Sequence, residues 1–255
     1  MSVKTLLDLS GRVALVTGGS RGLGLQIAEA LGEMGAKLAI SARKRDELDQ
    51  AVSHLGGNAS AFVADIGKRE TIAPLADAVL KKFGKVDILV NNAGATWGAP
   101  AEQHPLEAWD KLVNVNLSGA FVLTQIVALK SMIPARWGRI INVASIAGLM
   151  GQDPRFAPTA AYTATKHGLV GLTRQLAAEW GVHGITVNAI CPGFFPSKMT
   201  RATLDTAGAL IKEWTPTRRF GGEEDLKGLA VLLASEASRH ITGQAIAVDG
   251  GASVI

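Results

Sequence analysis

Tyr162 is the only tyrosine of this 255-residue chain, and Lys166 follows it four positions later in the stretch AAYTATKHG. On a helix the two side chains share one face, because residues four apart are surface neighbours. A free phenol has a pKa of about 10 and is a poor base near neutrality. An adjacent ammonium favours the phenolate, so we expect Lys166 to lower the pKa of Tyr162. The pair predicts proton transfer to or from an alcohol oxygen; the alternative is a packed tyrosine and a solvated lysine.

Ser145 is a third candidate for this chemistry. It ends an expected strand, 138–145, whereas Tyr162 and Lys166 belong to an expected helix, 160–181. In an open α/β sheet, ligands bind beyond the carboxyl ends of the strands. From that position the Ser145 hydroxyl can donate a hydrogen bond to the substrate oxygen that exchanges a proton with Tyr162.

The elements that must hold these residues alternate along the chain. Short β-branched runs predict strands, and helical spacing predicts the segments between them. Strands separated by helices form right-handed βαβ units and a parallel sheet. The prediction is one doubly wound α/β domain of the Rossmann type over residues 1–255, with strands at 12–19, 37–43, 59–65, 85–94, 138–145, 185–193 and 244–251 and helices at 23–35, 44–55, 68–83, 106–133, 160–181, 200–213 and 223–235.

The turn TGGSRGLG, residues 17–24, joins the first strand to the first helix and contains three spaced glycines. Glycines let a backbone approach a pyrophosphate closely, and a helix N-terminus supplies N–H donors and a positive dipole. In a doubly wound fold this turn faces the cofactor crevice. We therefore expect a dinucleotide to contact the turn, with a purely structural turn as the alternative; the residues concerned are Gly18, Ser20, Arg21, Gly22, Leu23 and Gly24.

The end of the second strand, SARKR, bears on the choice between NADP(H) and NAD(H). Ala42 stands where an NAD site has an acid for the ribose 2′-hydroxyl, and Arg43 follows it. Together with Arg21 this makes two guanidinium groups available for a 2′-phosphate. The sequence favours NADP(H); the alternative is that Arg43 merely begins a solvated, charged helix that runs to Glu47.

The composition argues against several other functions. The formal net charge is +4 and the basic residues are scattered, so nucleic-acid binding is not expected. The single cysteine, Cys191, excludes an internal disulfide and is expected to pack. The five histidines are dispersed without metal-ligand spacing, so no metal site is expected. Neither a signal peptide nor a membrane span is recognised, which predicts a cytoplasmic protein.

These motifs in combination resemble those of the short-chain dehydrogenase/reductase family, in its single-domain branch. Each stretch is a weak signal by itself, but together they run nearly from end to end and are highly specific. The matching stretches are TGGSRGLG, Asp65, NNAG at 91–94, NVNLSG at 114–119, INVASIAG at 141–148, YTATK at 162–166, PG at 192–193 and VDGG at 248–251.

The resemblance implies a role for each matching residue. Tyr162 resembles the family's proton-transfer residue, Lys166 the lysine that binds the nicotinamide ribose, and Ser145 the residue that orients the substrate oxygen. Asn116 corresponds to the residue that holds a water linking Lys166 to solvent. The remaining cofactor contacts implied by the resemblance come from Asp65, Ile66, Asn92, Ala93, Gly94, Ile190, Pro192, Gly193 and Ser197, the last where the family often has threonine.

The substrate is the least determined part of the prediction. The interval from Ser145 to Tyr162 is longer than the family usually has, and the extra residues in 151–159 are expected to lie over the substrate. Aromatic and apolar residues in the surrounding loops favour a ketone with an apolar arm, such as a 3-oxoacyl thioester. Cationic residues nearby make a gluconate-type or other polyol substrate the second candidate. The alternative for the aromatic residues is that they cover the cofactor and the core and do not contact the substrate. The aromatic and apolar residues are Trp97, Met150, Phe156, Phe194, Phe195 and Trp214. The cationic residues are Arg155, Lys198 and Arg201.

Two further expectations come from the resemblance. The alternative to an enzyme is a nucleotide-binding regulatory protein that has lost catalysis. Such a relative is expected to lack the tyrosine, the lysine or the serine of the site. This chain has all three, as Tyr162, Lys166 and Ser145. Relatives pair two long helices across a two-fold axis, here 106–133 and 160–181, and the apolar positions of these segments exceed one buried face. The chain is therefore expected to form a homotetramer.

Overall fold

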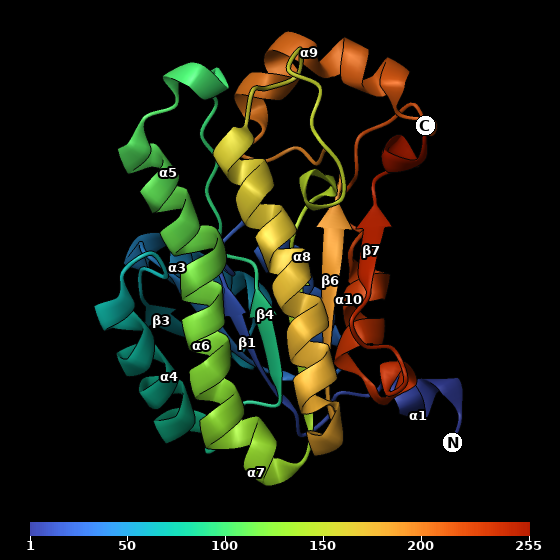
Figure 1. Ribbon diagram of the computed structural model, residues 1–255. Helices are drawn as coiled ribbons and strands as arrows, with labels where there is room; N and C mark the ends of the chain where they lie inside the picture. Colours follow the sequence, from blue (N-terminus) through green and yellow to red (C-terminus); the bar gives the residue numbers. More distant parts are fainter.

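Seven strands form one parallel sheet at the centre of the computed structural model, which describes residues 1–255 (Figure 1). Their order across the sheet is β3-β2-β1-β4-β5-β6-β7, and every neighbouring pair is parallel. This confirms the predicted doubly wound α/β fold. The strands are β1 (Val13–Thr17), β2 (Lys37–Ala42), β3 (Ala59–Val63), β4 (Ile88–Asn91), β5 (Gly138–Val143), β6 (Ile185–Pro192) and β7 (Ala245–Val248).

Helices cover both faces of the sheet. One hydrophobic cluster joins the sheet to α2 (Gly22–Glu33), α3 (Arg45–Leu55) and α10 (Lys227–Ala234). A second cluster joins the opposite face to α4 (Arg69–Phe83), α6 (Gly119–Val127) and α8 (Ala160–Trp180). The remaining α-helices are α1 (Val3–Leu7), α5 (Leu106–Val113), α7 (Ile133–Ala135) and α9 (Arg201–Trp214), of which α9 crosses above the carboxyl ends of the strands (Figure 1).

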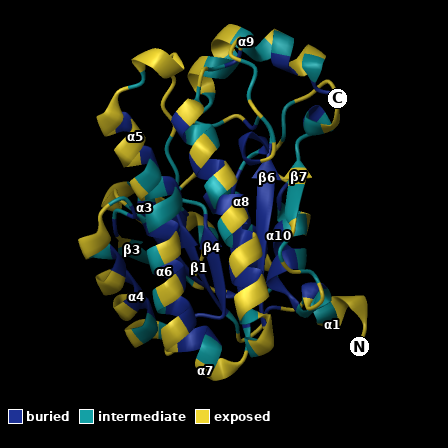
Figure 2. Cartoon of the chain, in the orientation of Figure 1, coloured by how far each residue is buried: buried dark blue, intermediate teal, exposed yellow.

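Side chains alternate between the two layers along the central strands. In β1, Ala14 and Val16 belong to the cluster with α2 and α10, whereas Leu15 belongs to the cluster with α4 and α6. All five residues of β1 are buried, which explains its continuous apolar run. Figure 2 shows the buried strands between helices whose outer faces are exposed.

The predicted long helix is continuous but not uniform. Two π-helical segments, Asn114–Ser118 and Ala128–Met132, join α5, α6 and α7 into one helix, Leu106–Ala135. By length and composition alone this helix would be able to cross a membrane, with a mean hydropathy of 1.7 over its most apolar window. Leu123 and Val127 pack in the core against the sheet, which accounts for much of that apolar character.

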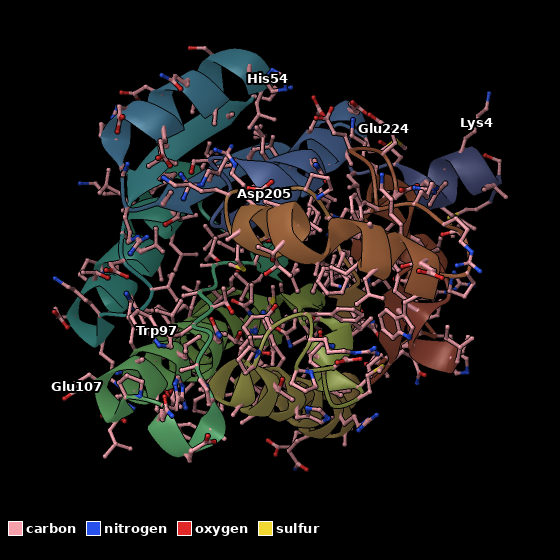
Figure 3. The ribbon with its side chains drawn as sticks, turned by 90° about the horizontal axis from the view of Figure 1, so that it is seen from above. Lys4, His54, Trp97, Glu107, Asp205 and Glu224 are labelled. Atoms are coloured by element: carbon pink, nitrogen blue, oxygen red, sulfur yellow. The ribbon has the colours of Figure 1, made fainter.

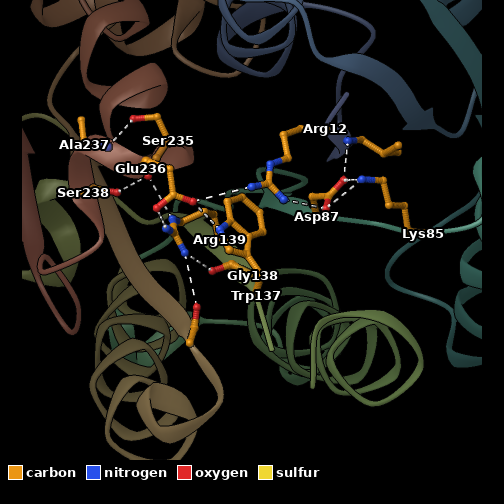
Figure 4. A network of polar contacts seen from close by, with 12 residues as sticks. Arg12, Lys85, Asp87, Trp137, Gly138, Arg139, Ser235, Glu236, Ala237 and Ser238 are labelled. Carbon is orange, nitrogen blue, oxygen red and sulfur yellow. Dashed lines mark hydrogen bonds and ion pairs between the residues drawn. The ribbon is translucent and has the colours of Figure 1, made fainter. Parts of the chain in front are cut away.

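A polar network ties together the amino ends of β1, β4 and β5 (Figure 4). Asp87, which precedes β4, pairs with Arg12, which precedes β1. Glu236 accepts a hydrogen bond from the Trp137 indole N–H and pairs with Arg139 in β5. The guanidinium groups of Arg12 and Arg139 lie 3.6 Å and 4.3 Å from the Trp137 ring centroid. Burial lowers the pKa of Arg139, and the nearby Glu236 opposes that effect.

The predicted elements are present, with two differences: α10 begins later than expected, and α1 is an additional helix. α10 begins at Lys227 instead of 223, because Asp225 accepts a hydrogen bond from the Gly222 N–H and pairs with Arg219, which holds this segment as a turn. α1 was not predicted. It has only five residues and none of them is buried.

Candidate active site

Tyr162, Lys166 and Ser145 lie together beyond the carboxyl end of β5. Tyr162 is in the first turn of α8, and the Nζ of Lys166, one turn later, lies 5.5 Å from the Tyr162 ring centroid. Ser145 follows β5, and its Oγ accepts a hydrogen bond from the Ala147 N–H at 3.1 Å. This bond caps a short 3₁₀ turn, η4 (Ile146–Gly148), which packs against α8. The strand end and the helix are thereby held side by side.

Burial dominates the electrostatics of the pair. Burial raises the pKa of the Tyr162 phenol above its usual value, and the hydrogen bond with Ser145 offsets only part of this effect. Burial is the larger effect in the chain by itself, and the expectation that Lys166 lowers this pKa stays a prediction. Lys166 is itself only 4% exposed, and burial lowers its pKa to about 8. Tyr162 is consequently neutral near neutral pH, which is the form that can donate a proton to a ketone oxygen.

Asn116 lies in the first π-helical segment and is buried. Its Oδ1 accepts a hydrogen bond from the Ala95 N–H at 2.8 Å, and its Nδ2 donates to the Ala95 carbonyl and to Thr165 Oγ1, both at 3.0 Å. Asn116 thus fixes the loop after β4 to α8, near Lys166. A Cβ at Gly94 in this loop would lie 3.8 Å from Lys166 Nζ. The water-holding role of Asn116 stays a prediction.

Asn92 holds the glycine turn in place. Its Nδ2 donates to the carbonyl oxygens of Thr17 and Gly18, at 2.9 Å and 3.1 Å. Gly18 has a φ of +65°, and a Cβ at Gly24 would lie 2.3 Å from Asn92 Nδ2. There is no room for a side chain at Gly24, and the Asn92 amide is committed to the protein itself. The sequence placed Asn92 among the cofactor contacts and did not reveal this positioning role.

A crevice of about 860 Å³ runs from α3 past the glycine turn to Tyr162. Figure 3 looks down on this edge of the molecule, with Asp205 marking α9 and His54 marking α3. Most of the predicted cofactor-binding residues line the crevice, namely Gly18, Ser20, Arg21, Gly22, Leu23, Gly24, Arg43, Asp65, Ile66, Asn92, Ala93, Gly94, Tyr162, Lys166 and Ser197.

Pro192 and Gly193 are exceptions, since neither lines the crevice. Pro192 is the buried last residue of β6. The Gly193 N–H donates to the Val248 carbonyl at 3.0 Å, toward β7. Their predicted contact with the cofactor stays a prediction.

The crevice is suited to a dinucleotide. Gly22 opens α2 with a φ of +54°, and a Cβ there would meet no atom within 4 Å, so this helix N-terminus is free to receive a phosphate. Ser41 Oγ, near the end of β2, is buried without a hydrogen-bond partner and lines the crevice. A polar ligand would satisfy such a group. Arg21 and Arg43, predicted for a 2′-phosphate, line the same crevice.

The aromatic residues predicted for the substrate pocket pack on one another. The ring centroids of Phe156 and Phe194 are 5.8 Å apart with an interplanar angle of 87°, and those of Phe156 and Trp214 are 5.3 Å apart. None of the three lines the crevice, and Phe156 is only 7% exposed. They anchor the segment 151–159 to the end of α9, which supports the alternative that these side chains close the structure.

Three other predictions about the substrate region are corrected or narrowed. Phe195 is 4% exposed in the hydrophobic core, so its placement in the pocket was wrong. Arg155 pairs with Asp153 two residues earlier, with 2.6 Å between Nη2 and Oδ2. Of the predicted cations, Lys198 alone lines the crevice, whereas Arg155 and Arg201, like Trp97 and Met150, do not.

Cys191 behaves as the sequence indicated. It is fully buried, and burial raises the pKa of its thiol to about 11. A thiolate nucleophile is therefore not formed near neutral pH.

A buried ladder of amides supports the site from within the sheet, and it was absent from the predictions. Asn91 Nδ2 donates to Thr124 Oγ1 at 2.8 Å and to Asn142 Oδ1 at 2.9 Å. Asn142 Nδ2 donates to Thr173 Oγ1 at 2.9 Å. The ladder links β4 and β5 to α6 and α8. Its signal in the sequence is an asparagine in each of two strands that are otherwise mostly apolar.

Comparison with known proteins agrees with this geometry. The family model for short chain dehydrogenases matches residues 12–208. A gluconate 5-dehydrogenase of Gluconobacter oxydans is 38% identical over 261 residues, covering 100% of this chain and 99% of the relative. The 3-oxoacyl-(acyl-carrier-protein) reductase of Escherichia coli is 37% identical, covering 96% and 98%. The crystal structure of a gluconate 5-dehydrogenase from Burkholderia cenocepacia, in complex with NADP and tartrate, has a TM-score of 0.93 at 34% identity, covering 100% of both chains.

The family match extends over most of the chain, and the relatives align over nearly their whole length with it. The same chain places Tyr162 and Lys166 in the lining of a dinucleotide-sized crevice, with Ser145 beside Tyr162. The protein therefore belongs to the short-chain dehydrogenase/reductase family and is an oxidoreductase.

Proposed function

We propose that the protein is an NADP(H)-dependent oxidoreductase that interconverts a ketone and a secondary alcohol. The observation that carries the proposal is the position of Tyr162 and Lys166 at one end of a crevice whose other end holds Arg21 and Arg43. When bound, NADP(H) supplies or accepts the hydride. The neutral Tyr162 phenol donates the proton to the substrate oxygen, and the Ser145 hydroxyl orients that oxygen by a hydrogen bond.

The choice of NADP(H) rests on the charges at the end of β2. Ala42 leaves no carboxylate in the strand end for a ribose hydroxyl, and two arginines line the crevice nearby. Arginine suits a phosphate because its planar fork donates two parallel hydrogen bonds. A related gluconate 5-dehydrogenase has NADP in its crystal structure, which supports the same assignment.

The substrate that we propose is a small hydroxylated ketone or its alcohol, of the sugar-acid or polyol class. Phe156, Phe194 and Trp214 pack on one another and do not line the crevice. Thr96 and Ser197 offer hydroxyls there, and Lys198 offers a cation to a carboxylate. This reverses the ranking that the aromatic residues suggested in the sequence. The similarity to gluconate 5-dehydrogenase supports the reversal.

A 3-oxoacyl thioester is the second candidate. Met199, which lines the crevice, is 43% exposed and offers an apolar surface to an acyl arm. The Escherichia coli reductase, at 37% identity, is named for such a substrate.

The test compares kcat/KM for NADPH-dependent reduction of 5-ketogluconate with that for acetoacetyl and longer 3-oxoacyl thioesters. We expect the ketogluconate to be the better substrate and Lys198→Ala to raise its KM with little change in kcat. A clear advantage for the thioesters would make the second candidate the function. No NADPH consumption with any ketone would overturn the oxidoreductase chemistry at this site.

We further propose a homotetramer that functions in the cytoplasm. The apolar residues that remain exposed on the helix Leu106–Ala135 support self-association, among them Trp109 and Phe121, each 39% exposed. The soluble-enzyme chemistry of the relatives' named activities supports the location.

A further inference from the structure

Glu47 occupies the end of the crevice where the two predicted phosphate-binding arginines lie. Its Oε1 accepts a hydrogen bond from Arg21 Nη1 at 2.8 Å and lies 3.2 Å from Lys44 Nζ. The Glu47 side chain is 23% exposed, whereas the side chains of Arg21 and Lys44 are 48% and 60% exposed. One partly buried carboxylate therefore holds two more exposed cations.

The position of Glu47 in the fold favours its charge. It lies in the first turn of α3, where the helix dipole stabilises an anion. Arg21 precedes α2 and Lys44 precedes α3, so the carboxylate bridges the starts of two helices. Arg21, Arg43, Lys44 and Glu47 all line the crevice. Arg43 is exposed and forms no ion pair, so its side chain is not held by Glu47.

We propose that Glu47 is a specificity-determining residue that weakens the preference of this site for a 2′-phosphorylated dinucleotide over an unphosphorylated one. The inference rests on the proposed NADP(H) function. A 2′-phosphate carries a charge of about −1.5 to −2 and must share Arg21 and Lys44 with the carboxylate, which also repels it. A ribose 2′-hydroxyl is a hydrogen-bond donor and meets no such repulsion from a carboxylate.

The substitution Glu47→Gln separates charge from geometry. Glutamine keeps an amide oxygen that can accept the Arg21 hydrogen bond, so the guanidinium keeps an anchor. It removes the negative charge that competes with the phosphate. Asp46→Asn is the matched control, because Asp46 lies in the same helical turn and carries the same charge, but neither lines the crevice nor pairs with Arg21.

The experiment measures dissociation constants by titration calorimetry for NADP⁺, NAD⁺ and 2′,5′-ADP with the wild-type protein and both variants. We expect Glu47→Gln to tighten binding of NADP⁺ and 2′,5′-ADP by about three- to tenfold, as the loss of one nearby like charge implies. NAD⁺ binding should be unchanged or weaker, and Asp46→Asn should change none of the three. The gain should shrink as salt is added, because part of it is screened electrostatics.

Three results would overturn the inference. Unchanged or weaker NADP⁺ binding by Glu47→Gln, with wild-type protein that still prefers NADP⁺ to NAD⁺, removes the role of Glu47 and leaves the proposed function intact. If Asp46→Asn tightens NADP⁺ binding as much as Glu47→Gln does, the effect comes from net charge alone, and the proposed role of Glu47 is wrong. Absence of saturable binding of any of the three ligands to the wild-type protein overturns both the inference and the proposed cofactor.

Discussion

Lys166 Nζ donates a hydrogen bond to the main-chain carbonyl of Val143 at 2.7 Å, at the end of β5. The ammonium is thus tied to the strand that precedes Ser145 and is buried there. Burial, and not the neighbouring phenol, sets its protonation: the pKa of Lys166 falls to about 8. The charge of this lysine is therefore sensitive to pH in a range where an ordinary lysine is always protonated.

This pKa predicts a pH-dependent stability. Between about pH 8 and 10.5 the unfolded chain holds a proton on Lys166 that the folded chain has released, so folded-state stability rises with pH in that window. The free energy of unfolding of the wild-type protein should gain about 3 kcal/mol relative to that of Lys166→Met between pH 7 and pH 11. Denaturant unfolding at several pH values measures the difference. Lys198→Met, at an exposed lysine, is the control and should track the wild type; a constant gap for Lys166→Met would contradict the prediction.

Tyr162→Phe should lower kcat by about 10²–10⁴-fold, because it removes the transferable proton and little else. Binding of NADPH should stay nearly unchanged, since the ribose contact is assigned to Lys166. Steady-state kinetics and fluorescence titration of NADPH measure the two effects separately. A variant that keeps a substantial fraction of wild-type kcat would show that another group donates the proton.

The pair of substitutions Ala42→Asp and Arg43→Leu should shift cofactor preference toward NAD(H). An aspartate at the end of β2 accepts from the ribose 2′-hydroxyl, and loss of Arg43 removes a phosphate contact. The ratio of kcat/KM with NADPH to that with NADH measures the shift. If the unmodified enzyme already has the higher kcat/KM with NADH, the interpretation of SARKR is incorrect.

Gly24→Ala should weaken dinucleotide binding by more than about tenfold, because overpacking at a close contact costs about 1–3 kcal/mol and moves the turn. The new Cβ would lie 2.3 Å from both Asn92 Nδ2 and the Gly18 carbonyl oxygen. Gly228→Ala is the matched control, since a Cβ there meets no atom within 4 Å. Calorimetric titration with NADP⁺ distinguishes them; equal affinities would show that the turn tolerates the side chain.

Phe121→Glu should reduce the molecular mass in solution by breaking the association of subunits. Phe121 is a large exposed apolar residue of the helix that we expect at the interface. Light scattering at micromolar concentration gives the mass. Val3→Glu, at an exposed residue of α1 outside both long helices, should leave the assembly whole. A monomeric wild-type protein would rule out the tetramer.

The arrangement of the elements was predictable because it depends on periodicity. Both faces of β1 are covered, so its apolar run stands out, and each helix presents one apolar face to the sheet. The turn before Lys227 could not be predicted, because it depends on one polar contact between Gly222 and Asp225. Local hydrogen bonds of this kind leave no periodic pattern in the sequence.

The parts of the site that depend on residue type could be predicted from the sequence. The parts that depend on how deeply a side chain is buried could not. Tyr162 and Lys166 could be identified as a pair, but the sequence gives no measure of desolvation, which raises the pKa of Tyr162. Phe195 was placed in the pocket because neighbouring aromatic residues look alike in a sequence, whereas the turn after β6 directs it into the core. Glu47 reaches Arg21 across 26 positions of the chain, a pairing that spacing does not reveal.

The network around Trp137 lies at the amino ends of the strands, and Tyr162 acts beyond their carboxyl ends. A change at Arg12 or Glu236 would therefore alter how much protein survives proteolysis in a cell, and leave the turnover of each surviving molecule intact. Such a lesion can be compensated by higher expression or a chaperone. A substitution at Tyr162 cannot be compensated in this way, because additional copies of an inactive enzyme restore no flux. Variants at the two ends should for this reason differ in their response to gene dosage.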